Sequence, residues 1–344
     1  MSKKFDVVIG NPPYQEEAGG AATHSMPIYH RFMEAAYDVG EKVVLITPAR
    51  FLFNAGYTPK AWNEKMLADH HLSVAHYVPN SDELFPGTDI KGGIAVTYRD
   101  ADKTVEPIGT FTKYPELNSI LHKVVKLHEE SIATVITSSR SYRYTPQMHS
   151  DHVQAMSMMT TGEQFKINTK TFQQLSFLYH SEQPQGDTSA ARVYGLAGRV
   201  RAFRWIRADY VSGPENFGAF KVAIPKANGS GSLGEVLSSP VVLEPQTAVT
   251  QTFITIGCFH DLAAAEACLK YVKTKFARAL LGILKITQDN PAKVWKYVPL
   301  QDFTSDSVID WTKSVAQIDQ QLYSKYGLKS SEITFIENQV KAME

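Results

Sequence analysis

Residues 5–14 read Phe-Asp-Val-Val-Ile-Gly-Asn-Pro-Pro-Tyr, and they limit what this chain can fold into more than any other stretch. An apolar run typical of a buried strand ends abruptly at Asn11. Two consecutive prolines then fix the backbone and remove two amide donors, so the strand cannot continue. The pattern predicts a rigid loop that presents the Asn11 side chain and the Pro12 carbonyl as preset hydrogen-bonding groups beside the ring of Tyr14. Such a loop suits chemistry on a flat amino-heterocycle.

The loop Asn11-Pro12-Pro13-Tyr14 resembles the catalytic loop of adenine-specific DNA methyltransferases of restriction–modification systems. The resemblance implies transfer of a methyl group from S-adenosylmethionine to the exocyclic amine of an adenine flipped out of double-stranded DNA. It further implies that the Asn11 side-chain oxygen and the Pro12 carbonyl accept the amine hydrogens, and that Tyr14 stacks on the base. Two acceptors off the ring plane favour a pyramidal nitrogen whose lone pair points toward the methyl group, so no strong general base is required.

The next hundred residues alternate between expected strands and helices. Strands are expected near 43–47, 72–78 and 93–98, and a helix is expected from Pro27 with one face formed by Ile28, Phe32, Ala35 and Ala36. This order predicts an α/β fold with a mainly parallel sheet, a partial Rossmann-like methyltransferase sheet. Residues 45–52 and 85–87 resemble segments of the same family, in which an aromatic residue near the second segment stacks on the flipped base. Phe85 is therefore a base-stacking candidate, with a core phenylalanine as the alternative.

The family also carries a Gly-rich turn after a strand and an acidic residue at the end of the next strand, which together bind the cofactor. No such segment precedes residue 5, and residues 229–234, which formally fit G-x-G-x-x-G, leave no room for the helix that must follow. We therefore expect that the cofactor-binding half is missing and that the S-adenosylmethionine site is incomplete. A second polypeptide could carry that half, the chain could be a truncated remnant, or it could serve another purpose.

The composition gives no global attraction to nucleic acid, because Lys+Arg and Asp+Glu both number 35. Cys258 and Cys268 lie in apolar surroundings without a cluster of metal ligands, so reduced core cysteines and no metal site are expected. The sequence shows no signal peptide and no long apolar run, so we expect a cytoplasmic protein without a membrane partner.

Four regions are expected along the chain. They are a catalytic half of a methyltransferase domain (1–113), a helical linker region (114–172), a mixed α+β target-recognition domain (173–304) and a helical tail (305–344). Within the third region, Asp261 is the expected N-cap of one long helix whose apolar stripe extends to Leu284. In the tail, a helical stripe is expected to start at Val308.

A basic segment interleaved with aromatic residues lies inside the expected recognition domain. Seven basic residues oppose only Asp209 and Glu215 between residues 192 and 226, which gives a net charge of plus five. Such a segment predicts contacts with DNA phosphates and bases, although a strand pair with charges on one face and aromatic residues in the core fits the alternation too. The DNA-binding candidates are Arg192, Arg199, Arg201, Arg204, Arg207, Lys221 and Lys226.

The sequence therefore predicts an S-adenosylmethionine-dependent DNA adenine methyltransferase that needs a partner half. The alternative is a non-catalytic DNA-binding specificity subunit, or an inactive remnant of such an enzyme.

Overall fold

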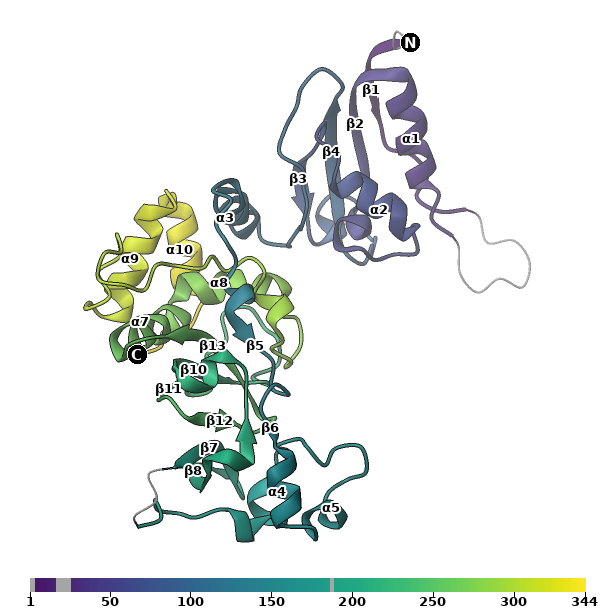
Figure 1. Cartoon of the computed structure of the whole chain (residues 1–344). Coiled ribbons are helices and arrows are strands. Elements are labelled where there is room, and N and C mark those ends of the chain that lie inside the picture. The colour runs from purple at the N-terminus through teal and green to yellow at the C-terminus, as the bar shows by residue number, and fades with distance from the viewer. Residues whose placement is uncertain (1–3, 17–25, 186–188) are drawn as a thin grey trace. The chain divides into compact units, whose positions relative to one another are not determined.

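The computed structural model describes residues 4–16, 26–185 and 189–344, and its chain divides into two units, residues 1–122 and 123–344 (Figure 1). The fold is mixed α/β with several separate sheets. Each unit is described by itself below.

The first unit is built on a four-stranded sheet with the order β1-β2-β4-β3. β1 pairs in parallel with β2, whereas β4 pairs antiparallel with both β2 and β3. Three strands therefore run in one direction and β4 runs in the other. The strands are β1 (Phe5–Gly10), β2 (Gly40–Pro48), β3 (Leu72–Val78) and β4 (Ile94–Asp100).

The expectation of a mainly parallel sheet missed the reversed strand β4. Between β3 and β4 the chain forms only the short turn η2 (Ser81–Glu83) and a loop, and no helix crosses the sheet. A parallel pairing of consecutive strands needs such a crossover, whereas an antiparallel pairing does not. The antiparallel arrangement therefore follows from the connection rather than from the strands.

Two helices, α1 (Tyr29–Val39) and α2 (Lys60–Leu67), cover one face of this sheet, together with the turn η1 (Ala49–Phe53) (Figure 1). The buried face of α1 is formed by Tyr29, Met33 and Tyr37, while Phe32 and Ala35 are exposed. The helix itself is confirmed, but the face expected from Phe32 and Ala35 was wrong. The two tyrosines bury their rings, a contribution that a search for purely apolar residues underestimates.

The second unit contains three small sheets, with strand orders β11-β10-β13-β5, β12-β7-β8 and β6-β9. Its strands are β5 (Ile136–Thr137), β6 (Arg143–Tyr144), β7 (Ala190–Ala197), β8 (Val200–Arg207), β9 (Val211–Ser212), β10 (Phe220–Pro225), β11 (Val241–Leu243), β12 (Thr247–Val249) and β13 (Phe253–Phe259).

The helices that follow the first unit's sheet begin with α3 (Pro115–Lys126), which spans the boundary between the units. The others are α4 (Pro146–Asp151), α5 (Ala155–Met158), α6 (Thr171–Gln174), α7 (Leu262–Lys273), α8 (Lys275–Leu284), α9 (Val315–Lys325) and α10 (Ser330–Gln339). Short 3-10 turns are η3 (Ile132–Val135), η4 (Ser176–Leu178), η5 (Ala208–Tyr210), η6 (Glu215–Gly218) and η7 (Ala292–Trp295).

The second unit extends across both expected boundaries, at 172 and at 304. β5, from the expected linker, pairs with β13, and Arg278 of α8 donates a hydrogen bond of 2.5 Å to the carbonyl of Lys341. The finer boundaries at 113, 172 and 304 stay predictions.

The expected long helix after Asp261 is two helices. Asp261 caps α7 as predicted, accepting a hydrogen bond of 2.8 Å from the Ala264 amide. α7 ends at Lys273, and the Thr274 hydroxyl caps α8 by accepting a hydrogen bond of 3.1 Å from the Ala277 amide. A threonine that caps one helix leaves helical geometry at that point, so the apolar stripe continues across a break.

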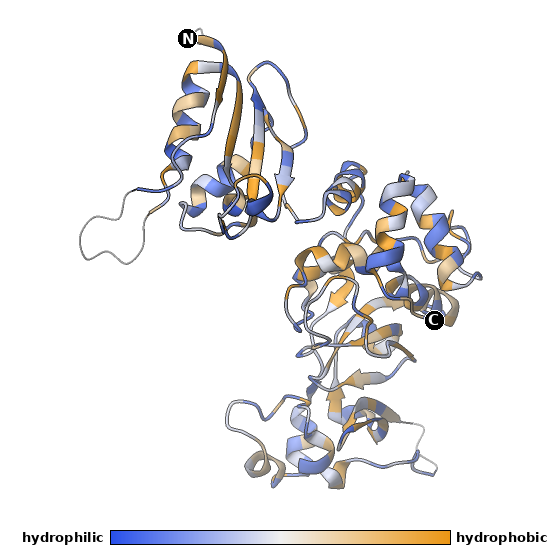
Figure 2. Ribbon diagram, turned by 180° about the vertical axis from the view of Figure 1, so that it is seen from behind, coloured by the Kyte–Doolittle hydropathy of each residue, from blue (hydrophilic) through white to orange (hydrophobic). Residues whose placement is uncertain are grey.

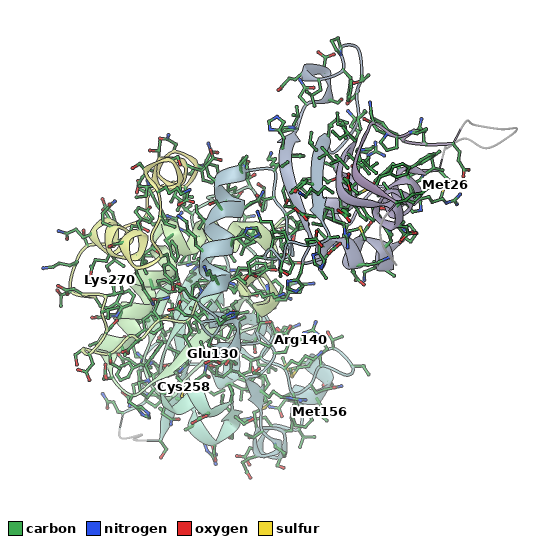
Figure 3. The ribbon with its side chains drawn as sticks, turned by 90° about the horizontal axis from the view of Figure 1, so that it is seen from above. Met26, Glu130, Arg140, Met156, Cys258 and Lys270 are labelled. Carbon is green, nitrogen blue, oxygen red and sulfur yellow. The ribbon has the colours of Figure 1, made fainter. Side chains whose placement is uncertain are left out.

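The expected tail helix begins later than its apolar pattern suggested. Val308 is 82% exposed and lies outside α9, which starts at Val315 behind the capping residue Ser314. Of the two cysteines, Cys268 is buried in α7 as expected, whereas Cys258 of β13 is exposed on the second unit (Figure 3). Both are free thiols.

Candidate active site

The loop Asn11–Tyr14 follows β1 at its carboxyl end. β1 and β2 are parallel and paired from Phe5↔Gly40 to Gly10↔Leu45, so their carboxyl ends lie side by side. In open α/β sheets this edge is where ligands bind. The loop Asn11–Tyr14 therefore lies at the edge of the sheet where a ligand is expected to bind.

A cavity of about 720 Å³ opens at this edge of the sheet. Its wall includes the whole Asn-Pro-Pro-Tyr loop and parts of three other segments of the first unit. The lining residues are Asn11, Pro12, Pro13, Tyr14, Gln15, Pro27, Tyr29, Pro48, Arg50, Gly56, Tyr57, Asp89 and Ile90. Small-molecule sites of proteins measure roughly 300–1,000 Å³, so this cavity is large enough for a nucleobase with its sugar.

Backbone hydrogen bonds anchor the loop to the start of α1. The Tyr14 carbonyl accepts a hydrogen bond of 3.1 Å from the Ile28 amide, and the Glu16 amide donates one of 2.9 Å to the Met26 carbonyl. Gln15 and Pro27 form an antiparallel bridge between the same two segments. Together with the two prolines, these bonds hold the backbone of the loop in one conformation.

Tyr14 is half-buried and packs against the core of the first unit. Burial raises the pKa of its phenol, an effect that the neighbouring Asn11 side chain opposes. Tyr14 is therefore neutral at physiological pH and offers an aromatic surface to the cavity. Asn11, at the end of the strand, is exposed and available to a ligand.

Tyr29 contributes a second buried phenol to the cavity wall. Only 1% of the residue is exposed, and no described residue forms a hydrogen bond of ordinary geometry with its hydroxyl. Burial raises the pKa of Tyr29 to about 12, although Thr58 and the charge of Arg50 oppose the rise. A buried polar group without a partner is costly.

Phe85, the expected base-stacking residue, is not among the residues that line the cavity. It is half-buried in the loop between β3 and β4, where its amide donates to the Ser81 carbonyl at 2.8 Å. Its role stays a prediction, although the same loop contributes Asp89 and Ile90 to the cavity.

Several lining residues escaped the sequence analysis, among them Tyr57, Arg50 and Asp89. Tyr57 is 73% exposed and has a positive φ of 64°, a conformation that non-glycine residues rarely adopt. Arg50 follows β2 and carries a positive charge into the same cavity. The sequence signals for Tyr57 and Arg50 were weak, because neither residue belongs to a motif with a fixed spacing from Asn11.

Four arginines lie on the strands of the β7–β8 hairpin. Their side chains form hydrogen bonds or ion pairs with other residues of the second unit. Arg192 pairs with Glu244 at 2.7 Å and stacks on the rings of Phe203 and Trp205. Arg201 donates to the carbonyls of Ser238 and Ser239, Arg204 to that of Phe203, and Arg207 pairs with Asp151 and Asp209. The register places Arg192, Phe203 and Trp205 on one face of the hairpin, so arginine and aromatic side chains stack together.

Arg199 and Lys226 are exposed, Arg199 at the turn of the hairpin. Lys221, by contrast, is fully buried in β10 and donates to the carbonyl of Ala219 at 3.0 Å. Its inclusion among DNA-binding residues was wrong, because the inward face of a strand cannot meet a phosphate.

Lys221 gives a prediction for stability. Burial lowers its pKa from 10.5 to about 7, so between about pH 7 and pH 10 the unfolded chain binds more protons than the folded chain. The free energy of unfolding should therefore rise with pH across this window, by at most about 1.4 kcal/mol per pH unit, and fall as pH drops toward 7. Lys221→Met should remove this slope, which urea unfolding at several pH values would measure. An unchanged slope would contradict the prediction.

Among the described residues, none forms a group of three or more potential metal ligands, and no described helix is long and apolar enough to span a membrane. Residues 229–234 form a loop between β10 and β11 in which the Glu235 carboxylate accepts hydrogen bonds from the amides of Ser230 and Gly231. These amides are already occupied by an anion of the chain, so they do not fit the cofactor. The incomplete S-adenosylmethionine site expected from the sequence stays a prediction.

The part of the chain that contains the loop also matches a known protein family. Residues 1–85 match the Eco57I restriction-modification methylase family. The resemblance to adenine-specific methyltransferases of restriction–modification systems is thus confirmed for this methylase segment, residues 1–85. An uncharacterized adenine-specific methylase of Mycoplasma pneumoniae is 32% identical over 94 residues, which are 26% of this chain and 22% of that protein. The chain thus spans about a fifth of the relative it matches.

Two solved structures of restriction enzymes align with the chain beyond the methylase segment. The type IIG restriction endonuclease BpuSI aligns with 97% of this chain and 53% of its own, at 8% identity and a TM-score of 0.35. The type IIL restriction-modification enzyme MmeI, solved in complex with DNA, aligns with 97% of this chain and 56% of its own, at 10% identity and a TM-score of 0.30.

Proposed function

We propose that this chain is the catalytic half of an S-adenosylmethionine-dependent methyltransferase that modifies the exocyclic amine of adenine in double-stranded DNA. The observation that carries the proposal is the position of Asn11–Tyr14, at the carboxyl end of β1 and on the wall of the 720 Å³ cavity. The family match of residues 1–85 supports the same reaction within a restriction–modification system. Such an enzyme acts where the DNA is, in the cytoplasm of a bacterial cell.

The chain's own residues orient the amine. A flipped adenine in the cavity stacks on Tyr14, and its amine donates one hydrogen to the Asn11 side-chain oxygen and one to the Pro12 carbonyl. The backbone that carries both acceptors is held in place before the base arrives, so little reorganisation is needed. Asp89 also lines the cavity, but its carboxylate lies 2.6 Å from the Lys91 ammonium, and we assign it no proton transfer.

The proposal includes a second polypeptide segment that carries the cofactor-binding half and covers β1. Phe5, Val7 and Ile9 alternate along one face of this strand and are exposed, Ile9 by 76% (β1 is apolar in Figure 2). Within the described part of the chain, β1 pairs only with β2, so its other edge is open. Strands of parallel sheets are normally paired and buried on both faces, and an open apolar edge promotes association.

The second unit supplies the DNA contacts in this proposal, through Arg199 and Lys226 and the exposed part of Arg207. Arg199→Ala should weaken binding to duplex DNA and reduce the slope of log affinity against log salt by about 0.9. Lys221→Met, which removes a basic residue from the same segment but from a buried site, should leave the slope unchanged. Fluorescence anisotropy at several salt concentrations would measure both. A slope that Arg199→Ala does not change would exclude a phosphate contact at the hairpin turn.

Calorimetry with S-adenosylmethionine tests the proposal as a whole. The full chain should bind the cofactor only together with the polypeptide that carries the cofactor-binding half, and the assembly should then form N6-methyladenine in DNA. Cofactor binding by the chain alone would show a complete site and overturn the need for a partner. DNA binding without cofactor binding, whether or not the second polypeptide is present, would favour a non-catalytic specificity subunit or an inactive remnant.

A further inference from the structure

Arg50 is built into the wall of the cavity by two glycines. It follows β2, and its aliphatic chain lies between Gly56 and Gly92, which come from different loops and have positive φ values of 91° and 88°. A Cβ atom at Gly56 would lie 2.6 Å from the Cβ and Cδ atoms of Arg50, and one at Gly92 would lie 3.0 Å from its Cγ atom. Both loops therefore leave space that this side chain fills.

The guanidinium of Arg50 is oriented by one hydrogen bond. Its Nε atom donates to the Lys91 carbonyl at 2.6 Å, and Lys91 belongs to the loop that also carries Gly92. This bond uses the Nε hydrogen and leaves the hydrogens of both Nη atoms for another acceptor. Within the described ranges, Arg50 forms no ion pair with a carboxylate, and the acidic residue of the lining, Asp89, pairs with Lys91.

The rest of the cavity sets the class of ligand. Asn11 and Tyr14 offer groups for a heterocycle on one part of the wall, while the Arg50 guanidinium offers hydrogen-bond donors on another. A cavity of about 720 Å³ with a fixed guanidinium beside a base site fits a nucleotide whose phosphate meets the arginine.

We propose that Arg50 binds a backbone phosphate next to the flipped adenine and so positions the nucleotide in the cavity. This inference rests on the proposed function and adds to it a phosphate site in the first unit, separate from the basic segment of the second unit. Arg50 is a positioning residue, because it acts on the backbone and does not touch the reacting amine.

The test uses the full chain and a trinucleotide with adenosine between two thymidines. Each of its two phosphodiester linkages is replaced in turn by an uncharged methylphosphonate, and affinity is measured by ligand-observed NMR. One of the two replacements should weaken binding to the unaltered chain about tenfold, the typical effect of losing a charged hydrogen bond. Arg50→Met keeps the aliphatic chain and should bind the natural trinucleotide about tenfold more weakly, with no further loss on neutralising that linkage.

Arg31→Met is the matched control, because Arg31 lies on α1 outside the cavity lining with a side chain that is 70% exposed. It should respond to both replacements as the unaltered chain does. Equal affinity of the unaltered chain for all three trinucleotides, or no binding of any of them, would overturn the proposal. If Arg50→Met does not fold, as its melting curve would show, the methylphosphonate comparison on the unaltered chain decides alone.

The two hypotheses can fail separately. The assembly could transfer methyl groups in a way that depends on Asn11 and still bind equally well when each linkage is neutralised. That result would refute the phosphate site and leave the proposed function standing. If neutralising one linkage weakens binding but no methyl transfer is found, the phosphate site would be supported and the proposed reaction refuted.

Discussion

Asn11→Ala should lower the turnover of methyl transfer to DNA by about a hundredfold or more, with little change in DNA affinity. The side chain is exposed at the end of β1, so its loss should not disturb the core. In the proposed mechanism it accepts one hydrogen of the adenine amine and helps to localise the lone pair, which matters in the transition state and little in binding. The measurement is the rate of N6-methyladenine formation by the assembly that contains both halves, beside DNA affinity from anisotropy.

A conservative variant separates chemistry from structure. Asn11→Asp keeps an oxygen acceptor at the same place and should retain more activity than Asn11→Ala. The assigned role would be refuted by parallel losses of turnover and DNA affinity in Asn11→Ala, because a group that acts only in the transition state leaves binding intact.

Trp295→Ala should reduce the free energy of unfolding of the second unit by about 3–5 kcal/mol. The indole is fully buried, and its Nε1 atom donates a hydrogen bond of 2.9 Å to the Asn290 side-chain oxygen. The substitution leaves a cavity and also removes a partner from Asn290, which is itself fully buried. Urea unfolding followed by far-ultraviolet circular dichroism would measure the loss.

Two other substitutions calibrate this loss. Trp311 is only partly buried, and its Nε1 atom donates to the Asp302 carbonyl at 2.9 Å, so Trp311→Ala should cost clearly less than Trp295→Ala. Val308 is 82% exposed, and Val308→Ala should change stability by less than about 0.5 kcal/mol. A loss in Trp295→Ala no greater than that in Trp311→Ala would mean that burial at residue 295 does not stabilise the unit as described.

The candidate site was predictable where its information is local. The strand, the stop at Asn11 and the rigid loop all follow from ten consecutive residues, since proline fixes its own backbone and cannot donate to a sheet. The cap at Asp261 and the range of β3 could be found for the same reason, because a cap or a short strand depends on its immediate neighbours.

The remainder of the cavity could not be found this way. Arg50 and Tyr57 come from the connection between β2 and α2, and Asp89 comes from the loop between β3 and β4. Only the folded sheet brings them to the edge where β1 and β2 end. Phe85 was chosen by resemblance. It lies in the loop that contributes Asp89 and Ile90 to the cavity, but it does not line the cavity itself. The path of the backbone decides which side chains of a loop face a site.

By itself, then, the sequence determined the rigid loop at Asn11–Tyr14, most of the strands and the resemblance of the first 85 residues to a methylase family. Only the tertiary structure decided which face of α1 is buried, that β4 runs antiparallel, and that Lys221 lies inside while Arg199 lies outside. These outcomes depend on partners far away in the chain: a strand's direction follows its connection, and a lysine is buried when the strands and helices around it close over it. Local propensity predicts neither the direction of a strand nor the burial of a lysine, because it contains no information about which segments meet.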